Sequence, residues 1–342
     1  MINRLFIDGN DAYLQYGVYV TSGGFNELVA FPPLKSVDSN DWQEEDGVEA
    51  DLSAPVLNTR EIQVKFAFGG LFSRFCAFIE LLSDGAYHEF YCAHIQRTFT
   101  LRMTQQPNLD VARMLGTVTI KFSDDFPMKG YKYKAPVSEV TPSDDYSLDN
   151  TPLTDYGCRV LKGSLSEVMK TAQVKQNLLR NIKTKTGAIY DGKRVTFKTK
   201  DVKLYCLMRA ESLTELWRNY DALLHDLIQP EERLLTVREL EQDFPCYYKS
   251  CQVSDFFPDG KIWLEFTLTL TFTGSFRLDD NDFVLATEDG IIVFTEDGEN
   301  AIEMLPDSFS ARSMQLVNDR SHIRFINNGN ICLLYTSPSP RD

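Results

Sequence analysis

Two segments of the chain, 140 residues apart, alternate apolar and polar side chains in the same order. Residues 59–66 (TREIQVKF) lie over residues 199–206 (TKDVKLYC) when the chain is compared with itself. A period of two is typical of a half-buried β-strand, because successive side chains point to opposite faces of a sheet. We therefore predict a strand in each segment. A chance match would not preserve the order of basic, acidic and apolar residues together with the alternation.

The match extends well beyond these strands. Residues 16–68 lie over residues 156–208 without a gap. The matched pairs include Tyr16-Gly17 with Tyr156-Gly157, Lys35 with Lys175, Gly47 with Gly187, Asp51 with Asp191, and Leu57 with Phe197. Internal repetition of this length predicts one domain, duplicated in tandem.

An amphipathic helix is predicted after the strand in each copy. In the second copy Ser212 and Glu215 form a capping box, which satisfies amides at a helix start, and Pro230 ends the pattern. The stripe predicted to face the core there is Leu213, Leu216, Trp217, Tyr220, Leu223, Leu224, Leu227 and Ile228. The stripe predicted in the first copy is Phe72, Phe75, Cys76, Ile79 and Leu82, closed by Gly85.

Each copy is expected to close with further strands, over residues 116–122 and 260–272. Strands, one helix and then strands predict a β-rich α+β fold rather than a parallel sheet. The fold class is thus two tandem β-sandwich or barrel domains, each with one packed helix, plus a partial β-rich C-terminal segment.

We divide the chain into five parts on this basis. The Pro, Ser and Asp residues after the first copy are typical of a linker, and the last eleven residues (CLLYTSPSPRD) resemble a translated sequencing adapter. The parts are 1–128 (first copy), 129–150 (linker), 151–275 (second copy), 276–331 (a truncated β-rich segment) and 332–342 (adapter artefact). In the fourth part, Thr-Glu-Asp-Gly occurs at 287–290 and again at 295–298, which predicts a short β-meander rather than a calcium loop.

Charge distinguishes the two copies at one matched loop. The formal net charge of the chain is −14. The first copy carries Asp38, Asp41, Glu44, Glu45, Asp46 and Glu49 in this loop, and the second carries Lys175, Arg180, Lys183 and Lys185. Two solvated loops that diverged independently explain this contrast. The alternative is an inter-subunit contact, in which the first copy of one chain packs beside the second copy of a neighbour.

Motifs that carry chemistry are not found in the sequence. The seven cysteines form no CxxC pair, so we expect reduced core thiols and no metal site. The four histidines are scattered, and the Gly-Gly pairs lack the downstream Gly-Lys-Ser/Thr of a phosphate-binding loop. We predict no enzyme activity and no cofactor. The basic loop lacks interleaved aromatic residues, so sequence-specific nucleic-acid binding is not expected.

The chain also shows no targeting segment. No apolar run approaches the ~20 residues that a membrane span needs, and the N-terminus (MINRLFIDGNDAY) lacks the apolar core of a signal peptide. Synthesis in the cytosol is therefore expected.

A resemblance to a known family rests on several short segments of the first copy. These are Phe6-Ile-Asp-Gly9, Tyr16-Gly17-Val18, Pro32-Pro33-Leu34-Lys35, Gly47-Val-Glu-Ala-Asp51-Leu and Val56-Leu57-Asn-Thr-Arg60-Glu-Ile62, followed by the helix and closing strand. The first copy resembles the N-terminal domain of siphophage distal tail proteins. The similarity covers about residues 3–127 and, more faintly, 151–274.

The resemblance implies a tail-tube-like fold and a structural role in a virion tail that is assembled in the host bacterial cytoplasm. Such proteins form a hexameric ring that joins the tail tube to the baseplate or tip, so tail-tube and baseplate proteins are the expected partners. Two copies per chain also resemble the baseplate hub of contractile-tailed phages, so either a trimer or a hexamer is expected. The alternative is a β-sandwich carbohydrate-binding or host-adhesion module, with Trp42 and Trp263 as its aromatic platform. An enzyme whose catalytic part follows residue 331 is a third hypothesis.

Overall fold

The computed structural model describes residues 4–21, 23–112, 115–175, 179–190, 195–274 and 276, and the backbone of five short strands beyond them. The chain forms two compact units. The first comprises Met1–Arg238 and Asp243–Phe276, and the second comprises Glu239–Gln242 and Arg277–Asp342.

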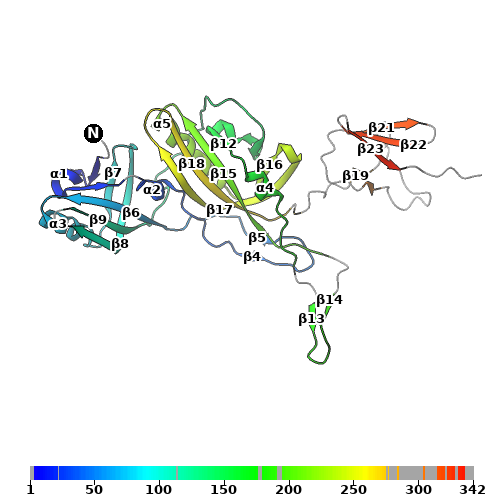
Figure 1. Cartoon of the computed structure of the whole chain (residues 1–342), viewed down its shortest axis with the longest axis horizontal. Coiled ribbons are helices and arrows are strands. Elements are labelled where there is room, and N and C mark those ends of the chain that lie inside the picture. Colours follow the sequence, from blue (N-terminus) through cyan, green and yellow to red (C-terminus); the bar gives the residue numbers. More distant parts are fainter. Residues whose placement is uncertain are drawn as a thin grey trace, which may run out of the picture. The chain divides into compact units, whose positions relative to one another are not determined.

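The first half of the first unit, here called the first copy, is drawn in blue and cyan in Figure 1. Its strands form one seven-stranded sheet in the order β2-β1-β7-β8-β9-β6-β3, with a separate β4-β5 hairpin. Its elements are β1 (Leu5–Ile7), β2 (Asn10–Asp11), α1 (Ala12–Tyr16), β3 (Val18–Val20), α2 (Asn26–Val29), β4 (Ser39–Asn40), β5 (Glu49–Ala50), β6 (Arg60–Gly69), α3 (Phe72–Leu82), β7 (His88–Cys92), β8 (Arg97–Ala112) and β9 (Leu115–Asp124).

The second copy is drawn in green and yellow. Its sheet has the order β11-β10-β16-β17-β18-β15-β12, with a separate β13-β14 hairpin. Its elements are β10 (Tyr146–Leu148), β11 (Thr151–Pro152), η1 (Leu153–Tyr156), β12 (Cys158–Val160), α4 (Ser164–Met169), β13 (Leu179–Asn181), β14 (Ala188–Tyr190), β15 (Lys200–Ala210), α5 (Leu213–Leu227), β16 (Arg233–Val237), η2 (Arg238–Leu240), β17 (Gln242–Phe257) and β18 (Ile262–Phe272).

The two sheets have the same topology. Counted from the first strand of each copy, both orders are 2-1-7-8-9-6-3. The hydrogen bonds agree in register as well: Gly69 N donates to Gly17 O at 3.0 Å, and Arg209 N donates to Gly157 O at 2.9 Å. The predicted duplication and the β-rich α+β class are confirmed, with two seven-stranded antiparallel sheets that each carry a packed helix.

The long strand β8 connects the two halves of the first sheet. Its residues 97–101 pair with β7, and its residues 102–112 pair with β9. The register shifts at Met103/Gln105 and Gln105/Asn108 mark bulges, which bend a strand and increase its twist. Strand β17 has a corresponding shift between Tyr248 and Ser250.

Helix α3 covers the first sheet with a stack of aromatic rings. Phe75 stacks on Phe68 at 4.0 Å between ring centroids, and Phe78 meets the edge of Phe66 at 5.5 Å. The buried residues of the helix are Phe75, Phe78 and Leu82, whereas Phe72 and Cys76 are exposed. The predicted stripe was wrong at these two positions and omitted Phe78. The helix is apolar on almost every side, so periodicity did not distinguish its buried face.

Helix α5 follows the prediction closely. Ser212 caps it by accepting from Glu215 N at 3.1 Å, and the Glu215 carboxylate accepts from Glu211 N at 3.0 Å. Leu227 is the last helical residue, three before Pro230. Its predicted stripe is buried except for the half-buried Trp217 and Ile228.

A basic residue at the start of the long strand anchors a short helix in each copy. Arg60 of β6 donates to the carbonyl oxygens of Leu28 and Ala30, each at 2.7 Å, at the end of α2. Lys200 of β15 donates in the same way to Val168 and, at 2.8 Å, to Lys170 at the end of α4. These carbonyls have no partner within their own helix, so a cation satisfies them.

Strand β10 lies inside the predicted linker 129–150, since it comprises residues 146–148 and pairs with β16. The preceding residues run along α5, where the Asn219 side chain bonds both the N–H and the carbonyl of Val137. The division of the chain into five parts stays a prediction.

In the second unit, β19 (Phe283–Val284) pairs with β20 (Glu303–Met304), and β21 (Met314–Asp319), β22 (His322–Asn327) and β23 (Asn330–Tyr335) form a three-stranded sheet. The predicted meander at 287–298 lies outside the described residues. Strand β23 includes residues 332–335 of the predicted adapter segment.

Candidate functional site

The two oppositely charged loops are equivalent hairpins. Strands β4 and β5 lie 140 residues before β13 and β14, and the turns contain Gly47 and Gly187, both with positive φ. The predicted acidic residues of the first hairpin, Asp38, Asp41, Glu44, Glu45, Asp46 and Glu49, are exposed. Lys183 and Lys185 of the second hairpin are exposed as well, whereas the side chain of Arg180 lies outside the described residues.

Lys175 is the exception among the predicted site residues, because it is only 2% exposed. Its Nζ donates to the carbonyl oxygens of Trp42 at 2.7 Å and Gly47 at 2.6 Å, and it pairs with the Asp41 carboxylate at 2.6 Å. All three partners belong to the first copy. A buried ammonium needs such partners to offset the loss of water.

The turn of the first hairpin forms further bonds with the second copy. Gly47 N donates to Phe197 O at 2.8 Å, and Phe197 N donates to the Asp46 carboxylate at 2.7 Å. Thr196 Oγ1 donates to Gln43 O at 2.9 Å. A Cβ at Gly47 would stand 1.7 Å from Thr273 O, so the backbones touch here and only glycine fits.

Residues 31–34 of the first copy dock beside this hairpin. Phe31 stacks on Tyr220 of α5 with ring centroids 3.9 Å apart. Tyr248 OH donates to Pro32 O at 2.9 Å, and Leu34 N donates to Lys249 O at 2.9 Å. The contact is apolar at its centre and hydrogen-bonded around it, as stable protein interfaces are.

A third group of contacts joins the β7–β8 region of the first copy to α5. Trp217 Nε1 donates to Ile95 O at 2.7 Å, and Arg97 pairs with Asp221 at 2.8 Å. The Arg97 guanidinium also lies 4.5 Å from the centre of the Trp217 ring. Together the three groups make an intramolecular interface between two copies of one domain.

Burial affects the titratable groups at this interface. Desolvation raises the pKa of Tyr220 and of Tyr248, so both phenols stay protonated, and Tyr248 donates its proton to Pro32 O. Burial lowers the pKa of Arg60, and the nearby Asp124 carboxylate opposes this effect. Arg60 and Arg97 line a cleft of about 600 Å³ between the copies. Each is already paired with an aspartate, so neither arginine is a free cation in the cleft.

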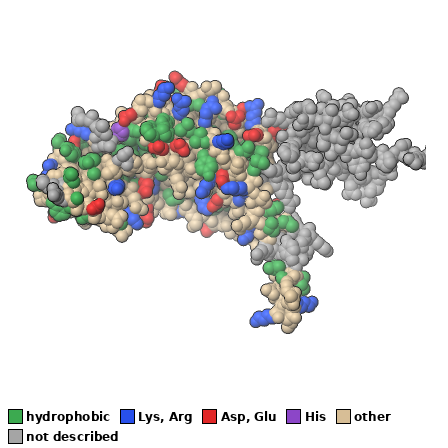
Figure 2. Space-filling model, viewed as in Figure 1, with side chains coloured by type: hydrophobic (Ala, Val, Ile, Leu, Met, Phe, Trp, Pro, Cys, Tyr) green, Lys and Arg blue, Asp and Glu red, His purple; other side chains and the backbone are tan. Residues whose placement is uncertain are grey.

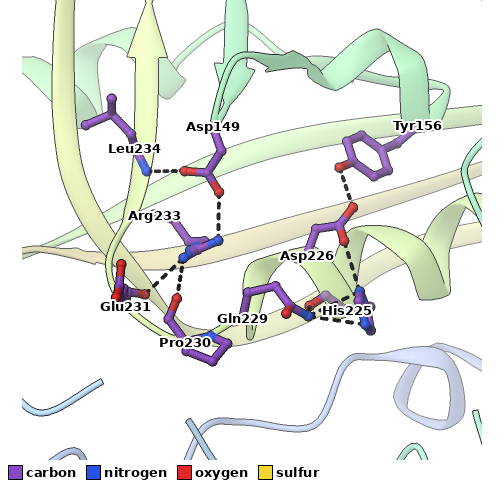
Figure 3. Close-up of polar contacts among 9 residues, drawn as sticks. All are labelled: Asp149, Tyr156, His225, Asp226, Gln229, Pro230, Glu231, Arg233 and Leu234. Atoms are coloured by element: carbon purple, nitrogen blue, oxygen red, sulfur yellow. Dashed lines mark hydrogen bonds and ion pairs between the residues drawn. The ribbon is translucent and has the colours of Figure 1, made fainter. Parts of the chain in front are cut away.

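A second polar network, drawn in Figure 3, ties the end of α5 to the strands around it. Tyr156 OH donates to Asp226 at 2.6 Å, and the other Asp226 oxygen contacts His225 Nδ1 at 2.9 Å. Arg233 pairs with Asp149 at 2.9 Å, and Asp149 also accepts from Leu234 N at 2.8 Å. Burial and the neighbouring Asp226 raise the pKa of Tyr156, so its phenol is not an activated nucleophile. The network therefore stabilises the packing of α5.

Two further histidines among the described side chains, His88 and His94, pair with carboxylates too. His88 contacts Asp8 at 2.7 Å and Asp84 at 3.2 Å, and these bonds raise its pKa against the opposing effect of burial. Within the described residues, no group of three or more His, Cys, Asp or Glu side chains could hold a metal ion. No helix among those residues is both long and apolar enough to span a membrane.

The opposite charges of the two loops predicted one contact of this site, between Lys175 and Asp41. Lys175 and Asp41, predicted to meet between neighbouring chains, meet within one chain. A contact of these residues between chains stays a prediction. Phe31 and Thr196 were not predicted as contact residues, and their signal in the sequence was their position beside matched residues of the repeat. Phe197 was predicted only as the match of Leu57.

Comparison with known proteins found a similarity to a solved structure. No family model matches the chain, and no curated protein matches it. The chain is similar to a solved structure entitled "Crystal Structure of SPP1 Dit (gp 19.1) Protein, a Paradigm of Hub Adsorption Apparatus in Gram-positive Infecting Phages". The identity is 14%, the match covers 79% of this chain and 98% of that chain, and the TM-score is 0.27.

Proposed function

We propose that the chain is a structural component of a phage or prophage tail end. It forms a ring that joins the tail tube to the baseplate or tip, and its function is assembly rather than catalysis. It acts in the virion tail, with tail-tube and baseplate or tip proteins as partners. The resemblance of residues 3–127 to distal tail proteins supports this role.

The observation that carries the proposal is the repeated strand order 2-1-7-8-9-6-3 within one chain. Duplicating a domain suits a protein whose units lie beside others like themselves, because each unit then has the surfaces that the next one needs. The two copies already pack on each other through backbone bonds and stacked rings. A ring built from such units has either three chains, which supply six domains, or six chains in two layers.

The mass of the purified full chain tests this proposal. Native mass spectrometry and sedimentation at micromolar concentration should give a closed trimer or hexamer, and negative-stain images should show rings. The rings should bind tail-tube or baseplate proteins encoded by neighbouring genes. A stable monomer at this concentration would contradict the proposal.

A glycan-binding module is the second candidate, and one aromatic pair favours it. Trp263 stacks on the exposed Phe257 with ring centroids 4.4 Å apart, and Trp42 is 52% exposed. Flat exposed rings of this kind can bind sugars. Glycan-array binding that is lost in Trp263→Ala and retained in Trp42→Ala would favour this candidate over assembly.

A further inference from the structure

We propose that the contact between the two copies within one chain is repeated between chains. The β13–β14 hairpin and residues 171–174 of one chain dock on α3, Lys35 and Leu57 of a second copy of this chain. This inference rests on the proposed function, and it names the two surfaces that would join the chains of the ring.

The donor surface follows from the repeat. Within one chain, residues 31–34 and the β4–β5 hairpin of the first copy dock on the second copy. Their counterparts, 140 residues later, are residues 171–174 and the β13–β14 hairpin. Val174 is 44% exposed, whereas its counterpart Leu34 bonds the second copy through its N–H. Figure 2 shows Lys or Arg and hydrophobic side chains on the β13–β14 hairpin.

The acceptor surface has the same backbone frame in both copies. Lys35 N donates to Val56 O at 2.9 Å, and Lys175 N donates to Thr196 O at 2.8 Å. Leu34 bridges Leu57 as Val174 bridges Phe197. The frame in the second copy holds the first hairpin, with Lys175 buried. Among the described residues, no hairpin lies on the frame of the first copy, and Lys35 is exposed.

Helix α3 shows the same contrast with α5. Aligned at their first residues, Phe72 and Leu213, the two helices lie 141 residues apart. Leu213 is 8% exposed and Phe31 covers Tyr220, whereas Phe72 is 48% exposed. Cys76, the counterpart of Trp217, is exposed as well. Figure 2 shows hydrophobic side chains gathered where Figure 1 places α1 and α3. The apolar helix face is thus covered in one copy and exposed in the other. An exposed apolar face favours a protein contact, and we expect its partner to be the same kind of surface that covers α5.

The chemistry of the contact transfers because much of it involves the backbone. Two of the three partners of Lys175 are carbonyl oxygens, so Lys35 can bind the corresponding carbonyls of Ile182 and Gly187 in the next chain. Asn181 replaces Asp41 and accepts from Lys35 through its amide oxygen. In the proposed contact the N–H of Val174 donates to Thr104 O of the next chain, because Thr104 occupies the bulge position in β8 that Lys249 occupies in β17.

The resulting interface is heterologous, because the donor lies on the second copy and the acceptor on the first. Chains therefore join head to tail, and the first and second copies alternate. Such an interface closes into a ring when its rotation divides a full turn, and otherwise forms a filament.

Two variants test the interface from opposite sides. Lys35→Glu places a carboxylate against carbonyl oxygens at the acceptor, and Gly187→Val adds bulk to the donor turn. No atom lies within 4 Å of a Cβ at Gly187 in the single chain, and Lys35 is exposed, so neither variant clashes within the chain. Gly187→Val carries the strain of a side chain at positive φ, which its control Gly260→Val shares, and each variant should fold. Each should weaken self-association at least about tenfold in sedimentation equilibrium. Matched controls are Lys203→Glu on an exposed strand position and Gly260→Val at another open turn with positive φ.

Mixing the two variants tests the head-to-tail direction. Gly187→Val keeps an intact acceptor and Lys35→Glu keeps an intact donor, so an equimolar mixture should give heterodimers that grow no further. A mixture that stays monomeric would overturn the head-to-tail contact.

Alkylation of Cys76 provides a readout for α3. It should be about fivefold slower in the assembled chain than in the dissociated Lys35→Glu chain, as measured by site-resolved mass spectrometry. Equal rates would overturn the docking on α3. Rings that form equally well in both variants contradict this interface and leave the proposed function standing, whereas an unaltered chain that stays monomeric contradicts both.

Discussion

At the scale of single residues, the two hairpin glycines show why a matched pair need not have a matched role. Gly47 and Gly187 have φ values of +69° and +81°, which most side chains avoid. Gly47 has a second constraint, since its Cα lies against the Thr273 backbone, whereas Gly187 has open space around it. One position thus needs glycine for conformation alone, and the other needs it for packing as well.

Gly47→Ala should therefore destabilise the dissociated chain more than Gly187→Ala. Both substitutions incur the left-handed cost of about 1–2 kcal/mol. Only Gly47→Ala adds overlap with a neighbouring backbone, which brings its expected loss to about 3 kcal/mol. Urea unfolding of both variants measures the difference, and equal losses would contradict the close contact at Thr273.

The sequence predicted the pairing of these glycines but not the burial of Lys175. Identity at a fixed separation of 140 residues is visible without a structure. The burial of Lys175 depends on the carbonyl oxygens of Trp42 and Gly47, and carbonyl groups are common to every residue and leave no mark in the sequence. The acidic residues of the first hairpin predicted a contact with Lys175 through charge, and one of them, Asp41, pairs with Lys175 within one chain.

At the scale of elements, each copy anchors a short helix to a long strand through one cation. Arg60 and Lys200 occupy the same position, but Arg60 also pairs with Asp124, whereas Phe272 stands at the corresponding place beside Lys200. Burial therefore lowers the pKa of Lys200 from the ordinary 10.5 to about 8. The order of basic, acidic and apolar residues predicted the two strands correctly. The bonds of Arg60 and Lys200 to the helix ends could not be predicted from that order.

The Lys200 anchor makes stability depend on pH in a defined direction. Between about pH 8 and 10.5 the unfolded chain keeps a proton that the folded Lys200 releases, so the free energy of unfolding rises with pH across this window. Arginine stays charged throughout, so Lys200→Arg should remove this rise. In urea unfolding at pH 7.5, 8.5 and 9.5, the free energy of unfolding of the wild type should increase with pH relative to that of the variant. Parallel curves would show that Lys200 titrates normally.

At the scale of the whole molecule, the first unit is two sheets of one design joined by an interface that belongs to neither sheet alone. The stacking of Phe31 on Tyr220 lies at the centre of that interface. The duplication, the strand order and α5 could be predicted from periodicity and capping. The buried face of α3 could not be predicted, because the helix has apolar residues on almost every side. Only its packing against the sheet determines which of them are buried.

Phe31→Ala should loosen the contact between the copies. Loss of a buried aromatic ring costs about 3–5 kcal/mol, and here the loss falls on the interface rather than on either core. We expect the variant to unfold in urea in two separate transitions. Near- and far-ultraviolet circular dichroism would measure them. Phe126→Ala, at an exposed ring, is the control and should leave a single transition. A single transition for both variants would mean that the copies unfold together without this stack.

The covalent joining of the copies also affects how an assembly begins. A tether turns an encounter between two molecules into one within a molecule, where the local concentration of the partner is typically millimolar. Half of the contacts in an alternating ring would then form during folding, before any two chains collide. Dilution would act only on the remaining half, so a ring of paired domains would persist at concentrations where the same number of separate domains would disperse.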